Sequence, residues 1–482
     1  MGQEAAPAPA KPATHVVLLS SPGAGHVQPM AELARRIVAL HDGFTATLVT
    51  YANFSSSGHA STLASSLPPS ISTAALPEVP LDDLPADARV ETRIFTVVKR
   101  ALPHLRALLA SGVAAFVADL LCPWTVEVSR ELGVPGYVFS TSSLTALFSM
   151  LHVPELDRTT TCEYRDLPEP VRLPGCVPLR GADLVDPVQD RTDPAYPLMV
   201  EFGNKLLLAD GFVVNTFDAM EHETIRAFEE LSREGGVYPP AYAVGPFVRS
   251  PSYSVNDEAA KKHGCIRWLD AQPDGSVLYV CFGSAGTLST KQNAELAAGL
   301  EASGQRFLWV VRFPSDKDKS ASYFGTAGHA NDPLSYLPQG FVERTKHVGL
   351  CVPPWAPQVE ILNHRAVGGF LSHAGWNSTL EAAAAGVPMV AWPLFAEQRV
   401  NAVMLSEGVG LALRLSRDAG VVPRDKVATV VTELMTGAKG ATARKKAREL
   451  RDAAAKAWAR DGPSRKAFHA VTGKWNKAHH AG

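Results

Sequence analysis

The residues whose side chains could bind a ligand are most concentrated between Trp355 and Gln398. Trp355 stands between Pro354 and Pro357, which restrict the backbone and would hold the indole where it could stack on a flat base. Further along, an apolar run at 367–371 is followed by a polar turn containing glycine and then by a helical pattern. Such a turn directs backbone N–H groups and the positive end of a helix at an anion, most often a phosphate. The stretch is therefore typical of a nucleotide site.

Several side chains of this stretch could add hydrogen bonds to a nucleotide sugar. Glu381 lies in the predicted helix, where a carboxylate can accept from two vicinal hydroxyls, as a ribose requires. Glu397 and Gln398 pair an acceptor with an amide, which suits the reading of sugar hydroxyls. Each residue alone could equally be a packing or loop residue, so the prediction depends on their order. Three side chains of the turn could donate to a diphosphate: His373, Asn377 and Ser378.

Two polar side chains in the N-terminal half also follow predicted buried strands. His26 comes after the apolar run 15–19 and a glycine turn, and Asp119 ends the apolar run 113–119. In open α/β sheets ligands bind at the carboxyl edge, where both residues would lie. His26 could be a base or an ordinary loop histidine, and Asp119 could equally cap the next helix. In the C-terminal half a second glycine turn, at 283–287, follows another apolar run and could bind phosphate.

The order of these motifs closely resembles the donor-binding signature of the plant secondary-product UDP-glycosyltransferases. The matching elements are Trp-Ala-Pro-Gln at 355–358, His-Ala-Gly-Trp-Asn-Ser at 373–378, Glu381, Gly-Val-Pro at 386–388, Trp-Pro at 392–393 and Glu-Gln at 397–398. Residues 22–29 are similar to the family's N-terminal motif, Pro-x-x-Gly-His-x-x-Pro. The resemblance covers nearly the whole chain and implies the two-domain GT-B fold and transfer of a sugar from a UDP-sugar.

The resemblance also implies roles for individual residues. His26 would be the catalytic base, and Asp119 would be the acid that pairs with it. Gln398 would select glucose, because glutamine at this position generally accompanies glucose in the family and histidine accompanies galactose. The other positions expected to bind the donor are Ser284, Trp355, Ala356, Gln358, His373, Trp376, Asn377, Ser378, Glu381 and Glu397.

These roles predict an inverting glucosyltransferase that moves glucose from UDP-glucose to the hydroxyl of a small phenolic or flavonoid-type acceptor, giving a β-glucoside. The segment 162–191, rich in proline and charge, resembles the branch that acts on hydroquinone and other small phenols. Acceptor contacts are expected near Glu91, Leu120 and Phe148, with core packing an equal alternative for the last two. C-glucosylation of phenolics and a non-catalytic sugar-nucleotide binder remain alternatives.

Two further enzyme classes fit the sequence poorly. A glycoside hydrolase needs two carboxylates facing one bond, and Trp355 and the two phosphate turns would have no use in it. A nicotinamide dehydrogenase would carry the full G-x-G-x-x-G pattern, which neither glycine turn has.

Strand and helix patterns alternate along both halves, which predicts an α/β protein of two doubly wound, Rossmann-like domains facing across a cleft. Helices are expected at 30–40 and 91–110, among others. The expected divisions are a disordered lead (1–14), an N-terminal acceptor-binding domain (15–249), a linker (250–262), a C-terminal UDP-sugar-binding domain (263–456) and a C-terminal helix (457–482) that returns to the first domain.

The amino-acid composition argues against several classes of binding partner. The formal net charge is −2 with both signs interspersed, so neither nucleic acid nor a membrane surface is predicted as a partner. No uncharged apolar run approaches the roughly 18 residues of a membrane helix, and the first residues lack signal-peptide features. We therefore expect a cytoplasmic monomer. The six cysteines have neither disulfide-framework nor metal-ligand spacing, so reduced thiols are expected. No carboxylate pair at metal-ligand spacing lies beside the phosphate turns, so no metal or other cofactor is expected. The resemblance implies UDP-glucose as the co-substrate.

Overall fold

The computed structural model describes residues 14–41, 43–54, 65–85, 87–233, 236–248, 264–317, 320, 332–415 and 420–481, without the side chains of 477–481. The expected lead up to residue 13, the expected linker at 250–262 and most of a polar insertion at 314–332 lie outside these residues.

The N-terminal half forms a seven-stranded sheet in which every neighbouring pair is parallel. In spatial order the strands are β3 (Ile71–Leu76), β2 (Phe44–Tyr51), β1 (Thr14–Leu19), β4 (Ala115–Asp119), β5 (Gly136–Ser140), β6 (Gly211–Val214) and β7 (Ala241–Ala243). The order reverses between β1 and β4, which makes the carboxyl ends of these two strands the switch point of the sheet.

The C-terminal half repeats this arrangement with six parallel strands. In spatial order they are β10 (Gly349–Val352), β9 (Arg306–Val310), β8 (Val277–Cys281), β11 (Val367–Ser372), β12 (Met389–Ala391) and β13 (Ala412–Arg414). Here the switch point lies between β8 and β11, the two strands that precede the predicted phosphate turns. The predicted class of two Rossmann-like α/β domains is confirmed.

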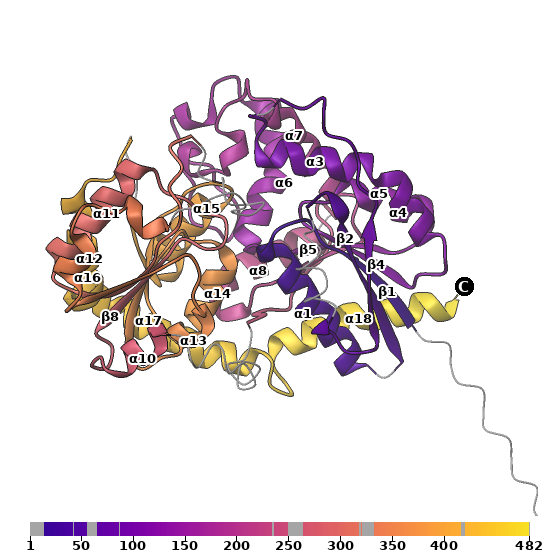
Figure 1. Cartoon of the computed structure of the whole chain (residues 1–482). Helices are drawn as coiled ribbons and strands as arrows, with labels where there is room; N and C mark the ends of the chain where they lie inside the picture. Colours follow the sequence, from indigo (N-terminus) through magenta and orange to yellow (C-terminus); the bar gives the residue numbers. More distant parts are fainter. Residues whose placement is uncertain are drawn as a thin grey trace, which may run out of the picture.

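Helices cover both faces of each sheet (Figure 1). Those of the N-terminal half are α1 (Ala24–Leu40), α3 (Val90–Arg100), α4 (Leu102–Leu109), α5 (Trp124–Glu131), α6 (Leu144–Thr159), α7 (Ala195–Leu206) and α8 (Asp218–Arg233). Those that follow are α10 (Gly264–Asp270), α11 (Thr290–Ser303), α12 (Phe341–Thr345), α13 (Gln358–Leu362), α14 (Trp376–Ala385), α15 (Gln398–Val403), α16 (Arg424–Thr436), α17 (Ala438–Ala457) and α18 (Pro463–Ala481).

The strands read as continuous apolar runs because both faces of each sheet are covered. Successive residues of a strand point to opposite faces. In β1, Val17 and Leu19 enter the core on one face, while Val16 and Leu18 enter the core on the other. The same alternation divides β8 between two cores of the C-terminal half.

Two expected helices have different bounds in the structure. The helix expected at 30–40 begins earlier, at Ala24, so His26 lies in its first turn rather than in the preceding loop. The helix expected at 91–110 is divided at Ala101 into α3 and α4, because Pro103 has no N–H with which to continue a helical ladder. Helices α7 and α8 were not anticipated.

Apolar side chains of each half pack in a core of the other half, and a C-terminal helix returns to the first half. Val400 and Val403 of α15 pack in the N-terminal core, and Phe217 and Met220 at the start of α8 pack in a C-terminal core. Helix α18 runs back beside the N-terminal sheet, where the chain ends (Figure 1). The halves are therefore joined by a shared apolar interface.

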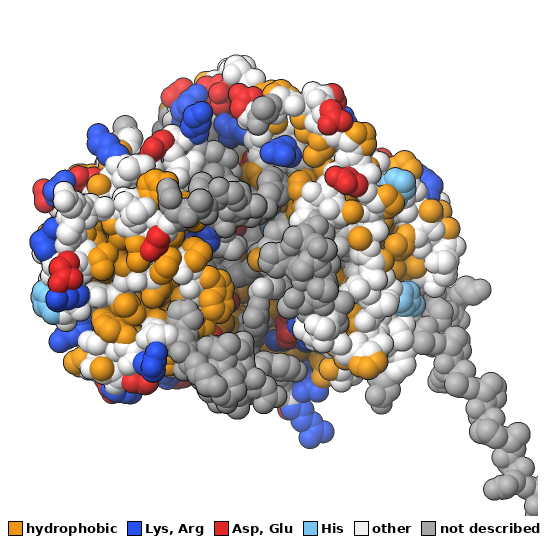
Figure 2. Space-filling view, viewed as in Figure 1, with side chains coloured by type: hydrophobic (Ala, Val, Ile, Leu, Met, Phe, Trp, Pro, Cys, Tyr) orange, Lys and Arg blue, Asp and Glu red, His pale blue; other side chains and the backbone are white. Residues whose placement is uncertain are grey.

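The surface view shows acidic and basic side chains scattered together over this face of the molecule (Figure 2). Among the described residues, no helix combines the length and the apolar character needed to cross a membrane.

The packing of helix α18 against the N-terminal domain can be tested at Trp475. Its ring is fully buried in the N-terminal core beside Tyr137. We expect Trp475→Ala to lower the free energy of unfolding by about 3–5 kcal/mol, because it leaves a large cavity. Urea denaturation followed by circular dichroism measures this. The exposed Lys466 on the same helix provides the control, since Lys466→Ala should change stability by less than about 0.5 kcal/mol. Equal effects of the two variants would contradict the packing described.

Candidate active site

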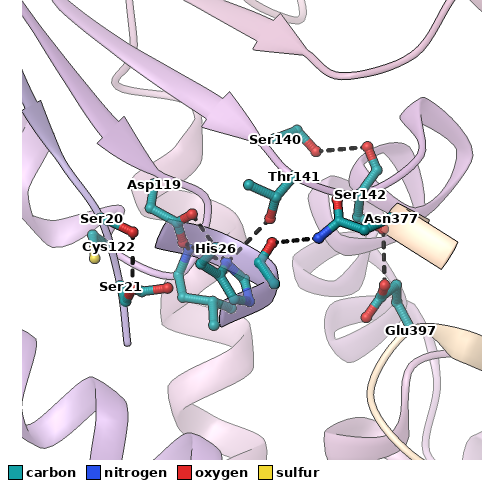
Figure 3. Close-up of polar contacts among 12 residues, drawn as sticks. Ser20, Ser21, His26, Asp119, Cys122, Ser140, Thr141, Ser142, Asn377 and Glu397 are labelled. Carbon is teal, nitrogen blue, oxygen red and sulfur yellow. Dashed lines mark hydrogen bonds and ion pairs between the residues drawn. The ribbon is translucent and has the colours of Figure 1, made fainter. Parts of the chain in front are cut away.

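His26 and Asp119 meet at the switch point of the N-terminal sheet (Figure 3). The Nδ1 atom of His26 lies 3.1 Å from Asp119 Oδ1 and 3.0 Å from Asp119 Oδ2, and Thr141 Oγ1 lies 3.1 Å from the same nitrogen. A carboxylate only accepts hydrogen bonds, so Nδ1 carries the proton in the neutral ring. Nε2 is then left with a lone pair and can accept a proton.

The backbone around Asp119 explains why this carboxylate is fixed. Asp119 is the last residue of β4 and its side chain is fully buried. Its Oδ1 also accepts a hydrogen bond from the Leu121 backbone N–H, at 2.9 Å. A buried carboxylate costs free energy unless it is paired and hydrogen-bonded, and here His26 and Leu121 supply both requirements.

The acidic neighbours of His26 together outweigh the effect of burial on its pKa. Burial alone would lower the pKa of His26, but the Asp119 charge and hydrogen bond, with a smaller contribution from Glu397, raise it above the ordinary 6.5. His26 still has 20% of its side chain exposed, so a ligand can reach the ring.

Pro29 connects the helix that carries His26 to the opposite domain. Proline has no N–H, so the carbonyl four residues earlier, Gly25 O, receives no helical hydrogen bond from it. Asn377 Nδ2, on the first turn of α14, donates to that carbonyl at 2.8 Å (Figure 3). The two predicted ligand-binding edges are thus joined directly, one residue from His26.

His373 lies between two glycines at the carboxyl edge of the C-terminal sheet. A Cβ atom on Gly283 or on Gly375 would come within 2.5 Å or 2.3 Å of the imidazole ring. Burial, with a smaller contribution from the Arg312 charge, lowers the pKa of His373 to about 4. The ring is therefore neutral at physiological pH and can donate one hydrogen bond. Ser284, beside Gly283, is exposed in the adjacent turn.

Three of the predicted donor-binding side chains form one hydrogen-bonded group. Gln358 Nε2 donates to Ser378 Oγ at 3.0 Å and to Glu381 Oε2 at 2.7 Å. Trp355 is 63% exposed, an unusual fraction for an indole, and it precedes this group in the chain. An exposed, proline-flanked indole offers a flat apolar surface on which a base could stack.

The predicted sugar-reading pair follows β12, in a part of the chain that contacts the N-terminal domain. Glu397 Oε1 accepts from Ser142 Oγ at 3.1 Å and from Asn401 Nδ2 at 3.3 Å (Figure 3). Gln398 Oε1 accepts from the backbone N–H groups of Leu394 and Phe395, at 2.9 and 3.1 Å. This orientation leaves the Gln398 NH₂ group to donate.

Four of the remaining predicted residues have buried side chains. Trp376 is buried and its Nε1 donates to the Asn215 carbonyl of the N-terminal domain at 2.7 Å. Ala356 is buried as well. Leu120 and Phe148 are almost fully inaccessible, and Phe148 packs edge-on against Phe228. Core packing accounts for both, so their contact with an acceptor stays a prediction, as does that of Glu91 at the start of α3.

Sequence reasoning missed several residues that hold the site. Thr141 follows the apolar strand β5, so the rule that ligands bind at carboxyl edges could have found it. Glu221 is buried and accepts from the backbone N–H groups of Leu144 and Thr145, which fixes the start of α6 just beyond Thr141. No local signal distinguishes Glu221 from the other acids of α8. Arg312, at the end of β9, was also missed.

All six cysteines lie in described residues, and none of them forms a disulfide bond. Within the described residues no group of three or more His, Cys, Asp or Glu side chains is placed to hold a metal ion.

The two histidines should titrate on opposite sides of pH 6.5. We expect the pKa of His26 above 6.5 and that of His373 near 4, measured by NMR of ring-labelled protein. The His26 pairing stabilises the fold fully below pH 6.5, and this contribution is lost as pH rises through the raised pKa. The His373 contribution is lost as pH falls from 6.5 toward 4, because only the unfolded chain is then protonated. Variants His26→Gln and His373→Gln assign the signals. Exchanged values would contradict the described environments.

Known proteins are similar in sequence to almost the whole of this chain. The profile of the family described as UDP-glucoronosyl and UDP-glucosyl transferase matches residues 253–438. The hydroquinone glucosyltransferase of Rauvolfia serpentina is 43% identical over 96% of this chain and 97% of its own length. UDP-glycosyltransferase 72B3 of Arabidopsis thaliana is 46% identical over 96% of both chains.

Solved structures agree with this likeness. Phytolacca americana UGT2, complexed with UDP-2fluoro-glucose and pterostilbene, superposes with a TM-score of 0.85 at 42% identity, covering 97% of this chain and 100% of that one. The chain therefore belongs to the plant UDP-glycosyltransferase family, in its small-phenol branch, and is a glycosyltransferase with the GT-B fold.

Proposed function

We propose that this enzyme transfers glucose from UDP-glucose to the hydroxyl of a small phenol, with His26 as general base and Asp119 as its partner. The observation that carries the proposal is the occupation of His26 Nδ1 by Asp119 and Thr141, which leaves Nε2 as the proton acceptor. The hydroquinone glucosyltransferase among the relatives, and the neighbour bound to UDP-2fluoro-glucose and pterostilbene, support this donor and this acceptor class.

The reaction is one displacement at the anomeric carbon. The phenol oxygen forms a bond to C1 of glucose while the bond from C1 to the diphosphate oxygen breaks, and the phenolic proton passes to His26 Nε2. A phenol has a pKa of about 10 and an imidazole about 6.5, so complete ionisation before attack is unnecessary. Base assistance in the transition state is sufficient. Asp119 then stabilises the imidazolium that forms.

The leaving diphosphate develops charge that the opposite domain can stabilise. The amino end of α14, where Asn377 and Ser378 lie, directs N–H groups and a positive dipole end toward an anion. His373 is neutral and its ring is held between two glycines, so it can donate one hydrogen bond from a fixed position. Fixed donors of this kind stabilise charge effectively because they need no reorganisation. With Ser284 they form the proposed diphosphate site.

The uridine and the sugar would occupy the two sides of this diphosphate site. Trp355 offers the stacking surface, and Ala356 would meet the base through its backbone. Glu381, tied to Gln358, would accept from the ribose hydroxyls. Glu397 and the NH₂ group of Gln398 would read the glucose hydroxyls, and this pairing of acceptor and donor is the basis for proposing glucose as the sugar.

Removal of the base should abolish most of the activity. We expect His26→Ala to lower kcat by about 10²–10⁴-fold, the usual contribution of a general base. Asp119→Asn should lower kcat by orders of magnitude as well, because an amide can hold the wrong tautomer. UDP release from UDP-glucose with hydroquinone as acceptor measures both. His222, an exposed histidine paired with Asp218 on α8, provides the control His222→Ala. Unchanged turnover in His26→Ala would exclude the proposed base.

The product should be a β-glucoside linked through oxygen. A single displacement inverts the α-linkage of UDP-glucose, so the anomeric proton of the product should show the large coupling of a β-anomer. NMR of the glucoside formed from hydroquinone measures both the anomer and the linked atom. An α-anomer would exclude direct displacement, and a carbon-linked sugar would favour C-glucosylation.

A further inference from the structure

A short segment of the N-terminal domain contacts the sugar-reading loop of the C-terminal domain. The segment, residues 181–188, consists of two 3₁₀ turns, the second of which contains Pro187. The loop, residues 394–398, carries Glu397 and Gln398. The Asp186 backbone N–H donates to the Ala396 carbonyl at 2.8 Å, and Asp186 Oδ1 lies 2.9 Å from Arg399 on the first turn of α15.

The sugar-reading loop has an unusual backbone conformation at the residue that Asp186 contacts. Ala396 has a φ of 54°, in the left-handed region that a residue with a Cβ seldom adopts. Such a residue persists only where its surroundings hold it. Its carbonyl is the group to which Asp186 donates, and its C-terminal neighbour is Glu397. The orientation of Glu397 therefore depends on the peptide group of Ala396, which accepts a hydrogen bond from the N-terminal domain.

Asp186 is itself held within the N-terminal domain. Arg89, at the start of α3, lies 3.5 Å from Asp186 Oδ2 and 2.6 Å from Asp193 Oδ2. The side chain of Asp186 is only 23% exposed. Asp186 is thus placed between one arginine of its own domain and one arginine of the donor domain, Arg399.

We propose that Asp186, through Arg399 and the Ala396 carbonyl, positions the sugar-reading loop and so sets the placement of the transferred glucose. This role rests on the proposed function, in which Glu397 and Gln398 read the sugar. UDP without its sugar would not contact the loop. Loss of the Asp186 charge should therefore affect UDP-glucose and leave UDP unaffected.

A second ion pair between the domains provides a matched control. Asp183, in the same segment, pairs with Arg414 on β13, whose guanidinium Nη1 lies 3.3 Å from Asp183 Oδ2. Within the described residues, neither member of this pair forms a hydrogen bond or an ion pair with residues 394–398. Asp183→Asn thus weakens the attachment of the segment without touching the loop.

The experiment compares kinetics with binding. Asp186→Asn and Arg399→Gln should each lower kcat/KM for UDP-glucose by between about tenfold and about 100-fold, since misplacing a reacting group is costly. The Kd of UDP, measured by calorimetry, should stay unchanged, so that the ratio of UDP-glucose affinity to UDP affinity falls. Arg399→Lys keeps the charge and should retain most of the activity. Asp183→Asn should leave both quantities unchanged.

Three results would overturn the proposal: unchanged kcat/KM in Asp186→Asn, a parallel loss of UDP affinity, or an equal effect of Asp183→Asn. Each assigns Asp186 a merely structural role or none. If the wild-type enzyme transferred no glucose to any phenol, the proposed function would fail instead. The ratio of UDP-glucose to UDP affinity would then still test the positioning role.

Discussion

The pairing of a buried carboxylate with an imidazole is the interaction on which the site depends. Asp119 ends a strand whose every residue is buried, so its charge requires compensation. His26 provides it through Nδ1, and the same contact fixes the ring and raises its pKa. The hydrogen bond that compensates the buried Asp119 charge therefore also leaves the lone pair of His26 on Nε2. One pairing therefore serves both the stability of the fold and the proposed chemistry.

The two domains complete this arrangement by contacts that originate in local sequence. Pro29 leaves the Gly25 carbonyl without a helical partner, and Asn377 of the opposite domain fills that position. Ser143 donates to Asn401, which in turn donates to the carbonyl of Ala374, a second alanine with positive φ. The two alanines with positive φ in the described part of the C-terminal domain are therefore both held by contacts that lead to the N-terminal domain. The geometry of each half of the site therefore depends partly on contacts with the other half.

Much of this could be predicted from the sequence, for identifiable reasons. Apolar runs that end in polar residues predicted the strands and placed His26 and Asp119 at one edge, and the order of motifs from Trp355 to Gln398 predicted the donor side. Glu221 and Asp186 could not be predicted, because their roles depend on contacts far apart in the chain. The early start of α1 was missed because glycine and proline at its first turns weaken the helical pattern. Acceptor contacts could not be predicted from the sequence, because core packing explains apolar residues such as Leu120 and Phe148 equally well.

The most direct test of the central claim is a crystal structure of the enzyme with UDP-2-fluoroglucose and a phenol acceptor. The account predicts the phenol oxygen within hydrogen-bonding distance of His26 Nε2, facing the anomeric carbon on the side opposite the diphosphate. Asp119 and Thr141 should remain on Nδ1. A phenol oxygen out of reach of His26, or on the same side of the sugar as the diphosphate, would contradict the account.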